Sequence, residues 1–531
     1  MPMRRRDLLG GTAALVGLGL TRQAWAQDFP KDACDTLPVP AEGPPFRQLP
    51  VVESVGGALR TTLSMTTLPV TVGGIDMLMA AYNGTFPGTL YRLKPGDRLQ
   101  WNLVNRLDLI GLPPDSDQPS DKTKMLVDTN IHTHGLQVDP GPGGDDVLTK
   151  VSPGETKCYT YDIPGPGTDR AQPAGLYWYH PHKHGSTSHQ GWQGLAGPIV
   201  IEGDIDKVPE VAAARERVLV LNELLFNHKG ETPSAPIVPV AGFVPFTSEP
   251  SMPLDIRFPV NGVLTPDIGI RPGETQRWRV LAAGPHRFFR LKIDGHDMWQ
   301  IAQDGIPFDR ARRVNEIVLA PGNRAEFIIR GGSRGRYGVR ALCADQGHPG
   351  GPRPEVMLAT LVSDGDPMDG ALPEELVPAP VIPPDAPRGL DRTVVFSGNV
   401  ATRPVEFFLD GKKFDPNIVD QQVVAGTVEE WTLINKDVFR HPFHIHVNPF
   451  QVIEVNGDPV TDPIWWDTFA LPSMGSAKVR MYFRPDVTGR TVYHCHILPH
   501  EDNGMMALMQ INPGPSSPPR RDLPLTCEVP E

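Results

Sequence analysis

The chain has 531 residues, a length that exceeds one ordinary hydrophobic core and indicates two to four domains. Glycine (53) and proline (59) are abundant and charged residues make up 21%, which is typical of a turn-rich β protein and excludes a largely disordered chain. The formal net charge of −12 disfavours binding to nucleic acid or to an anionic membrane surface.

Residues 1–26 have the pattern of an export signal. Basic residues at 4–6 precede a short apolar run at 13–20 and an Ala-Trp-Ala cleavage site at 24–26. The run is too short to span a bilayer. The pair Arg5-Arg6 resembles a twin-arginine signal, which predicts export of a folded protein to the periplasm or beyond. Removing the segment takes away four arginines and one aspartate, so the mature chain carries −12 − 3 = −15.

A pattern of a turn glycine, a tryptophan five residues later and an alternating strand occurs three times. The three glycine–tryptophan pairs are Gly96 with Trp101, Gly273 with Trp278, and Gly426 with Trp431. The spacing predicts an all-β fold of three β-sandwich domains at 45–204, 205–365 and 385–515. A proline-rich stretch at 373–387 is the expected linker before the third domain.

The middle copy of the pattern lacks the histidines of the other two. A second repeated strand begins at Gly175, Gly335 and Gly489, and only its first and third copies end in histidine, at His180 and His494. We therefore expect the middle domain to frame the other two rather than to carry chemistry.

Five cysteines follow the signal, an odd number for an exported protein. Cys495 lies in a His-Cys-His motif and has a separate role below. Cys34 and Cys527 lie near the two ends of the mature chain, which suggests a disulfide between them. Cys158 and Cys343 leave two other connectivities open.

Ten of the sixteen histidines fall in four clusters that each contain a His-x-His pair. On a strand, residues i and i+2 point to the same face, so each pair directs two imidazoles to one place. Two pairs lie in the first domain and two in the third, and packing of these domains would bring eight imidazoles together. Eight neutral imidazoles suit copper. The pairs are His132 and His134, His180 and His182, His444 and His446, and His494 and His496.

Cys495 lies between two of these histidines and should point to the opposite face of its strand. There it can join His441 and His500 in a trigonal set, with Met505 as a weak axial ligand, which is the composition of a blue-copper electron-transfer site. Met506 is the alternative axial residue.

The four motifs, in this order, resemble those of the multicopper oxidases, which include the laccases and their bacterial relatives. The resemblance covers nearly the whole mature chain. It implies cupredoxin-like Greek-key domains, four copper ions and the reduction of dioxygen to water with electrons from a reducing substrate. It implies that the ligands are His441, Cys495, His500 and Met505 for type 1 copper, His132 and His444 for type 2, His134, His180 and His496 for one type 3 copper, and His182, His446 and His494 for the other.

Two acids are candidates for supplying protons, which the reduction of dioxygen consumes. Glu501 directly follows His500, and relatives that act in copper efflux carry a proton-donating glutamate there. Asp145 resembles the acidic residue of the family beside the type 2 copper, and Asp146 is an open alternative. His184 extends the second motif by two residues, but the family uses only the first two histidines.

The sequence predicts a laccase-like oxidase of phenols and similar reductants, acting as a monomer. The alternative is a metal-ion oxidase for Cu(I), Mn(II) or Fe(II). Relatives specialised for Cu(I) carry a methionine-rich insertion before the third domain, whereas residues 363–390 contain only Met368. We therefore expect electron transfer from an organic donor to an exposed edge of His441 or His500.

Overall fold

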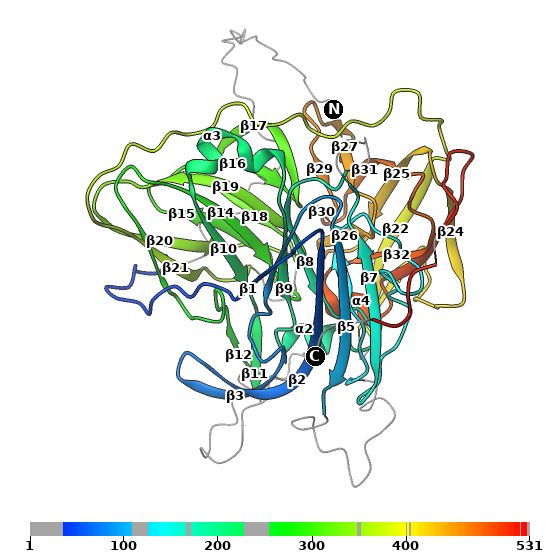
Figure 1. The fold of residues 1–531 in the computed structure, drawn as a ribbon, viewed down its shortest axis with the longest axis horizontal. Helices are drawn as coiled ribbons and strands as arrows, with labels where there is room; N and C mark the ends of the chain where they lie inside the picture. Colours follow the sequence, from blue (N-terminus) through cyan, green and yellow to red (C-terminus); the bar gives the residue numbers. More distant parts are fainter. Residues whose placement is uncertain are drawn as a thin grey trace, which may run out of the picture.

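The protein is described by a computed structural model over residues 36–108, 126–165, 171–227, 254–347, 352–399, 401–402, 405–520 and 522–527 (Figure 1). The expected signal at 1–26 and Cys34 lie outside these residues. The described chain is almost entirely β-structure with a few short helices, so the predicted all-β class is confirmed. Within these ranges no helix is long and apolar enough to cross a membrane.

The first domain consists of two sheets and one short helix, α2 (Thr187–Trp192). In spatial order, one sheet contains β1 (Val51–Glu53), β4 (Leu90–Leu93), β9 (Gly197–Ile201), β8 (Gly175–His180) and β6 (His132–His134). The other contains β3 (Ile75–Tyr82), β2 (Ala58–Val72), β5 (Arg98–Arg106) and β7 (Thr156–Asp162).

The middle domain begins with the 3-10 helix η1 (Asp204–Lys207) and α3 (Pro209–Ala213), and its two main sheets have five strands each. One contains β10 (Arg215–Leu221), β14 (Thr275–Ala282), β19 (Arg324–Arg330), β16 (Met298–Gln303) and β17 (Ile306–Val314). The other contains β13 (Asp267–Ile270), β21 (Val356–Ser363), β20 (Gly335–Leu342), β15 (Phe289–Ile293) and β18 (Ile317–Leu319). A separate hairpin pairs β11 (Leu224–Asn227) with β12 (Leu254–Arg257).

The third domain again consists of two sheets. A short helix, α4 (Leu498–Asp502), follows strand β32. One sheet contains β23 (Glu406–Leu409), β22 (Arg392–Asn399), β25 (Val428–Asn435), β31 (Ser476–Tyr482), β27 (Phe450–Val455) and β28 (Asp458–Pro459), with β29 (Trp465–Trp466) paired to β27. The other contains β24 (Val419–Val424), β33 (Met506–Asn512), β32 (Gly489–Cys495), β26 (His441–Ile445) and β30 (Thr468–Leu471).

The repeat seen in the sequence is also a repeat of strand pairing. The tryptophan strands β5, β14 and β25 each pair in parallel with the first long strand of their domain and antiparallel with a later one. Trp101, Trp278 and Trp431 are fully buried, each in the core of its own domain. The turn glycines before them adopt positive φ, a conformation that side chains disfavour. Each main sheet draws its strands from one of the three expected ranges, whose boundaries remain a prediction.

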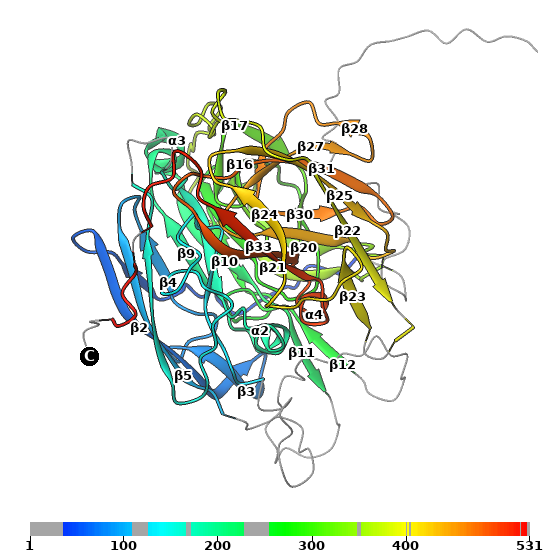
Figure 2. The same ribbon diagram turned by 90° about the vertical axis from the view of Figure 1, so that its right-hand side faces the viewer.

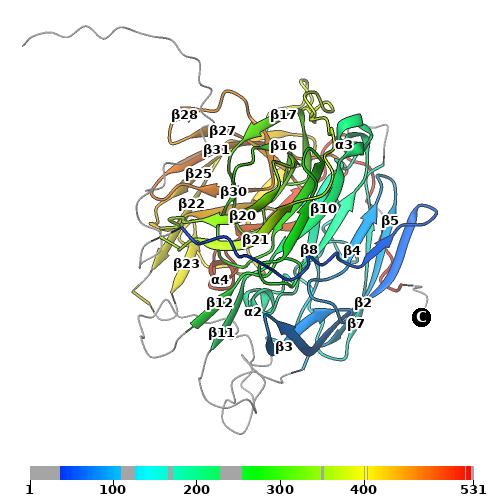
Figure 3. The ribbon, with the colours of Figure 1, turned by 90° about the vertical axis from the view of Figure 1, so that its left-hand side faces the viewer.

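The three domains pack side by side. Figure 1 shows the middle-domain strands (green) on the left and the third-domain strands (yellow to red) on the right, with β2, β5 and β7 of the first domain in front. Figure 2 views the third domain face on, and Figure 3 the middle domain. Helices α2 and α4 meet between the first and third domains, where Asp502 accepts hydrogen bonds from the backbone N–H groups of Gly185 and Ser188.

A disulfide ties the C-terminal segment to the first domain, but its pairing differs from our expectation. Cys527 pairs with Cys158 on β7, so the suggested bond between Cys34 and Cys527 is wrong. The expectation rested on nearness to the chain ends, which is not nearness in space. Cys343 is also disulfide-bonded, and Cys495 is free and buried.

Candidate metal centres

The histidines of the first domain lie at the edge of one sheet. Strand β6 pairs antiparallel with β8, which places His132 opposite His180 and His134 opposite Trp178. His182 follows two residues after the end of β8, and its backbone N–H donates to the Asn130 side chain at 2.7 Å.

The histidines of the third domain are placed by an equivalent pair of strands. Strand β26 pairs antiparallel with β32, so His444 lies opposite His494 and Phe443 lies opposite Cys495. Because side chains alternate across a strand, Cys495 points away from the face that carries His494. One strand thereby serves two separate sites.

The two sets of histidines meet face to face across the domain interface. The rings of His132 and His446 stack with centroids 3.8 Å apart, and those of His134 and His444 stack at the same distance. All four side chains are buried. The convergence that strand alternation predicted is therefore present in the fold.

The predicted ligands assemble into compact groups whose donor atoms all lie within 4.8 Å of one another. Two groups coincide with the two type 3 sets, and another joins the type 2 pair to a type 3 histidine. These groups are His134, His180 and His496; His182, His446 and His494; His132, His134 and His444; and, on the other face, His441, Cys495 and His500.

The donor chemistry of the cluster fits a metal. The Nε2 atoms of His182, His446 and His494 lie 3.0–3.3 Å apart. A neutral imidazole has only one N–H, so three converging nitrogens cannot all satisfy one another, whereas a cation accepts every lone pair. Burial lowers the pKa of His494 to about 4 and that of His182 well below 6.5, which favours the neutral, metal-binding form.

The second ring nitrogen of several ligands is fixed by an oxygen acceptor. Nδ1 of His180, His494 and His444 donates to the backbone carbonyls of Pro181, Cys495 and Asp467 at 3.0, 3.1 and 2.7 Å, respectively. Such a bond sets the tautomer and directs the Nε2 lone pair to the cluster.

His134 has the opposite orientation. Its Nε2 lies 3.0 Å from Oδ1 of Asp467, and its Nδ1 lies 3.3 Å from Nε2 of His496. Asp467 is thus a site residue that sequence reasoning missed. It follows a pair of tryptophans and has no periodic or motif signal, and only the folded contact reveals it.

The group around Cys495 has the composition of a type 1 site. Its Sγ lies 3.4 Å from Nδ1 of His441 and 3.7 Å from Nδ1 of His500, and those two nitrogens are 3.2 Å apart. All three side chains are fully buried. Burial raises the pKa of the Cys495 thiol, and a coordinated cation is what deprotonates such a thiol.

Met505 is better placed than Met506 to be the axial ligand. The backbone carbonyl of Met505 accepts the N–H of Cys495, and Met505 belongs to the same buried cluster as Cys495. Met506 packs instead in a separate cluster with Val492.

The expectation of an exposed edge on His441 or His500 is wrong. Both residues are fully buried, and the ring of Phe407 stacks on His500 with a centroid distance of 3.9 Å. The motif defines ligand types, but burial depends on loops and aromatic side chains elsewhere in the chain.

Asp145, rather than Asp146, faces the cluster. Nδ1 of His132 donates to its Oδ2 at 2.7 Å, and the backbone N–H of Thr133 donates to its Oδ1 at 2.8 Å. Burial raises the pKa of Asp145 to about 7 in spite of these bonds. Asp146 instead accepts the backbone N–H of Leu148.

Glu501 lies on α4 beside two ligands of one predicted type 3 copper. Its carboxylate is fully buried, 3.3 Å from Nδ1 of His494 and 3.6 Å from Nδ1 of His182. Burial, reinforced by Asp502, raises the pKa of Glu501 well above 4.5. This shift favours the protonated form of the carboxyl group, which lies within reach of two predicted ligands.

The remaining histidines lie apart from these groups. His184 packs against the Phe414 ring, 3.9 Å from Asp502, and belongs to none of the ligand groups. His189, His286 and His296 are likewise outside them. His228 and His348 lie outside the described residues.

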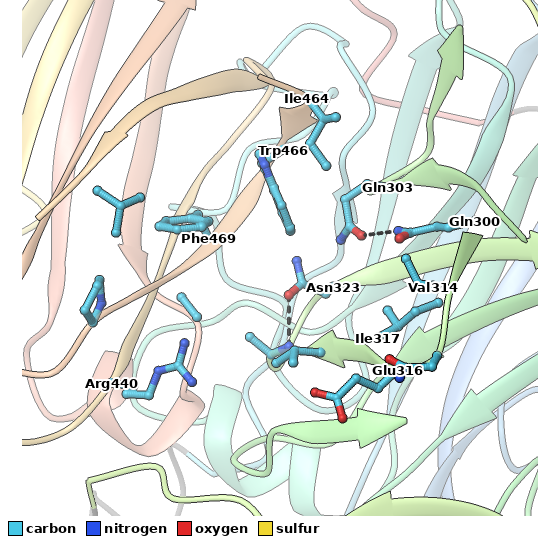
Figure 4. A pocket seen from close by; sticks show the side chains of 16 residues that line it. Gln300, Gln303, Val314, Glu316, Ile317, Asn323, Arg440, Ile464, Trp466 and Phe469 are labelled. Carbon is cyan, nitrogen blue, oxygen red and sulfur yellow. Dashed lines mark hydrogen bonds between the residues drawn. The ribbon is translucent and has the colours of Figure 1, made fainter. Parts of the chain in front are cut away.

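A cavity of about 130 Å³ opens between the middle and third domains (Figure 4). Trp466 and Phe469 form one side, and Gln300, Gln303 and Asn323 form part of the other. Its walls contain none of the predicted ligands. Asn323, however, donates to the carbonyl of Thr468 at 2.8 Å. This bond links the cavity wall to the part of the third domain that lies beside the histidine cluster.

Three cupredoxin-like domains with a cysteine–histidine site and a histidine cluster at their interface define the class of blue copper oxidases. Multicopper oxidase family profiles match residues 124–205, 204–363 and 382–515. The chain belongs to the multicopper oxidase family and is an oxidoreductase that uses dioxygen. The family implies bound copper, which the histidine groups fit.

Known relatives match most of the chain. It is 27% identical to a multicopper oxidase of Staphylococcus aureus over 440 residues, covering 81% of this chain and 83% of that one. It is 26% identical to a laccase of Bacillus subtilis over 479 residues, covering 81% and 89%. Its fold is similar to that of a multicopper oxidase from Campylobacter jejuni described as a metallo-oxidase, with a TM-score of 0.70, 23% identity and coverage of 92% and 99%.

Proposed function

We propose that this protein takes single electrons from phenols or similar organic reductants at a type 1 copper held by His441, Cys495, His500 and Met505. The eight paired histidines would hold the three-copper cluster that accepts these electrons. The observation that carries this proposal is the position of Cys495, whose neighbours on both sides are cluster histidines. When bound, the copper ions supply one-electron chemistry and the four-electron reduction of dioxygen to water.

The residues between the two sites provide a short route for electrons. The carbonyl oxygen of Cys495 accepts a hydrogen bond from Nδ1 of His494 at 3.1 Å. This bond links the backbone of a type 1 ligand directly to a cluster ligand. A substrate need not touch the cluster, because oxidation and dioxygen reduction occur at separate sites.

The two buried acids supply and hold protons beside different histidines of the cluster. Burial favours the protonated form of Glu501 beside His494, and Asp145 orients His132 through Nδ1. A pKa of about 7 allows Asp145 to exchange a proton near neutral pH.

An organic reductant is supported by the lack of soft metal donors in the segment before the third domain. Met368 is its only methionine, and the linker that follows is fixed to the edge strand β17 by backbone bonds from Ala311 to Glu374 and from Leu376 to Asp309. Trp465 then donates to the carbonyl of Pro380 at 2.8 Å. A linker that is held by these bonds and contains few methionines offers no group of thioethers to bind Cu(I).

A metal-ion oxidase is the second candidate. The Campylobacter jejuni neighbour is described as a metallo-oxidase, whereas a neighbour from Ochrobactrum sp. is described as active towards lignin model compounds. The acidic chain also tolerates a cationic substrate. Met474 is 67% exposed, and its backbone N–H donates to the carbonyl of Asp437 near the predicted type 1 site.

The deciding experiment compares kcat/KM for 2,6-dimethoxyphenol with kcat/KM for chelated Cu(I), Mn(II) and Fe(II), without added copper. We expect the phenol to have the highest kcat/KM. The substitution Met474→Leu should leave kcat/KM for the phenol and for the metal ions unchanged. A strong preference for Cu(I) that Met474→Leu removes would assign the protein to metal oxidation.

We also propose that residues 1–26 direct twin-arginine export to the periplasm. Replacing Arg5 and Arg6 by lysine keeps the charge but removes the arginine pair. Fractionation should then find the variant in the cytoplasm. Continued export would instead indicate an ordinary secretion signal.

A further inference from the structure

The middle domain contributes no predicted ligand, yet the turn between its strands β18 and β19 lies against the cluster. This turn, residues 320–323, brings Gly322 to the ring of His496, and the first residue of β19, Arg324, reaches Asp467. The two contacts reach different predicted ligands, because Asp467 in turn bonds His134.

Gly322 leaves no room for a side chain. It has a φ of +90°, and an added Cβ would lie 2.8–3.0 Å from three ring atoms of His496. Cβ atoms do not approach other atoms this closely, so a side chain would displace the ring. The ring cannot move freely, since its Nε2 lies 3.3 Å from Nδ1 of His134.

Arg324 is fully buried and uses its whole guanidinium group. Nη1 and Nη2 donate to the two carboxylate oxygens of Asp467 at 2.8 and 2.6 Å, a bidentate pair. The remaining donors reach the carbonyls of Leu176, Gly322 and Asp304 at 2.9–3.1 Å. One side chain therefore joins all three domains, including β8, the strand that ends at His180.

Asp467, which Arg324 holds in place, bonds in turn to two predicted ligands. Its carboxylate bonds Nε2 of His134, and its backbone carbonyl accepts Nδ1 of His444 at 2.7 Å. Gly135 completes the packing, because an added Cβ there would lie 2.5 Å from Nη2 of Arg324 and 2.7 Å from Oδ2 of Asp467. The glycine that follows His134 is thus explained by the approach of a middle-domain arginine.

We propose that Gly322 and Arg324 of the middle domain are positioning residues of the copper cluster: Gly322 sets the ring of His496, and Arg324 orients His134 and His444 through Asp467. The proposal rests on the proposed function. It gives the middle domain a part in metal binding that its lack of histidines conceals.

The test measures copper per chain by mass spectrometry and the type 1 and type 2 signals by electron paramagnetic resonance, alongside thermal unfolding. For Arg324→Gln and Gly322→Ala we expect the type 1 signal to persist while about one copper or more is lost from the cluster. Arg324→Lys keeps the positive charge but not the bidentate geometry of the guanidinium group. It should retain more copper than Arg324→Gln.

Matched controls lie in the same domain. Arg277 is also buried and paired with an acid, Glu326, at 2.6 Å, and Gly273 is another Pro-Gly turn glycine of positive φ whose added Cβ would meet the carbonyl of Met368. Arg277→Gln and Gly273→Ala should lower the unfolding temperature without loss of copper. Should Arg324→Gln not fold, Gly322→Ala and the isosteric Asp467→Asn give the same readout.

Equal copper content and an unchanged type 2 signal in both Gly322→Ala and the Arg324 or Asp467 variant would overturn the proposal, as would equal copper loss in the controls. A wild-type protein that takes up no copper would overturn the proposed function as well. The two failures are therefore distinguishable in one set of samples.

Discussion

The carboxylate of Glu501 lies 3.3 Å from Nδ1 of His494 inside a fully buried site. Burial raises the pKa of Glu501 and so favours the protonated form of its carboxyl group. For Glu501→Gln, which keeps the shape but removes the exchangeable proton, we expect reoxidation by dioxygen to slow by about 100-fold. Reduction of the type 1 site by substrate should stay fast. Stopped-flow measurement of both half-reactions checks this, and a slowed reduction step would place Glu501 in substrate binding.

Asp437 is expected to tune the type 1 site through His441. Its Oδ2 lies 3.4 Å from Nε2 of His441, and its side chain is almost fully buried. A nearby negative charge stabilises oxidised copper more than reduced copper. Asp437→Asn should therefore raise the type 1 potential and leave the blue colour. A redox titration in which the potential stays constant or falls would contradict this role.

Met505 is also expected to tune the potential of the type 1 site. Loss of a weak thioether ligand destabilises the oxidised state, so Met505→Leu should remain blue and have a higher type 1 potential. Met506→Leu is the matched control, because Met506 packs in a different cluster. If Met506→Leu shifts the potential and Met505→Leu does not, the axial ligand is misassigned.

The metal-free protein should lose stability on acidification. Burial lowers the pKa of His180 to about 3 and that of His494 to about 4, whereas an unfolded chain takes up these protons near 6.5. The unfolded state then binds more protons between these values, so the free energy of unfolding falls as the pH is lowered from 6.5. From pH 6.5 to 5 each such histidine contributes a loss of about 2 kcal/mol. Denaturant titrations of metal-free protein at both pH values test this, and equal stabilities would contradict it.

Local patterns were sufficient to predict the strands and the grouping of the paired histidines. Strand alternation places His494 and His496 on one face and Cys495 on the other, and it requires no knowledge of distant contacts. The choice between Asp145 and Asp146 was beyond it, because these residues lie in a turn, where alternation does not hold. The disulfide partner of Cys158, the burial of His500 and the bond from Arg324 to Asp467 all depend on residues far apart in sequence. No periodicity encodes such contacts.

The central claim is that Cys495 holds a type 1 copper that passes electrons to a separate three-copper cluster. Its most direct test is the copper content, visible absorption and oxidase activity of wild type and Cys495→Ser prepared side by side. We expect wild type to be blue with four coppers per chain. Cys495→Ser should lose about one copper, the blue colour and the oxidase activity, because the thiolate is the source of the colour and the entry point for electrons. A Cys495→Ser protein that stays blue, or that oxidises phenols at the wild-type rate, would contradict the account.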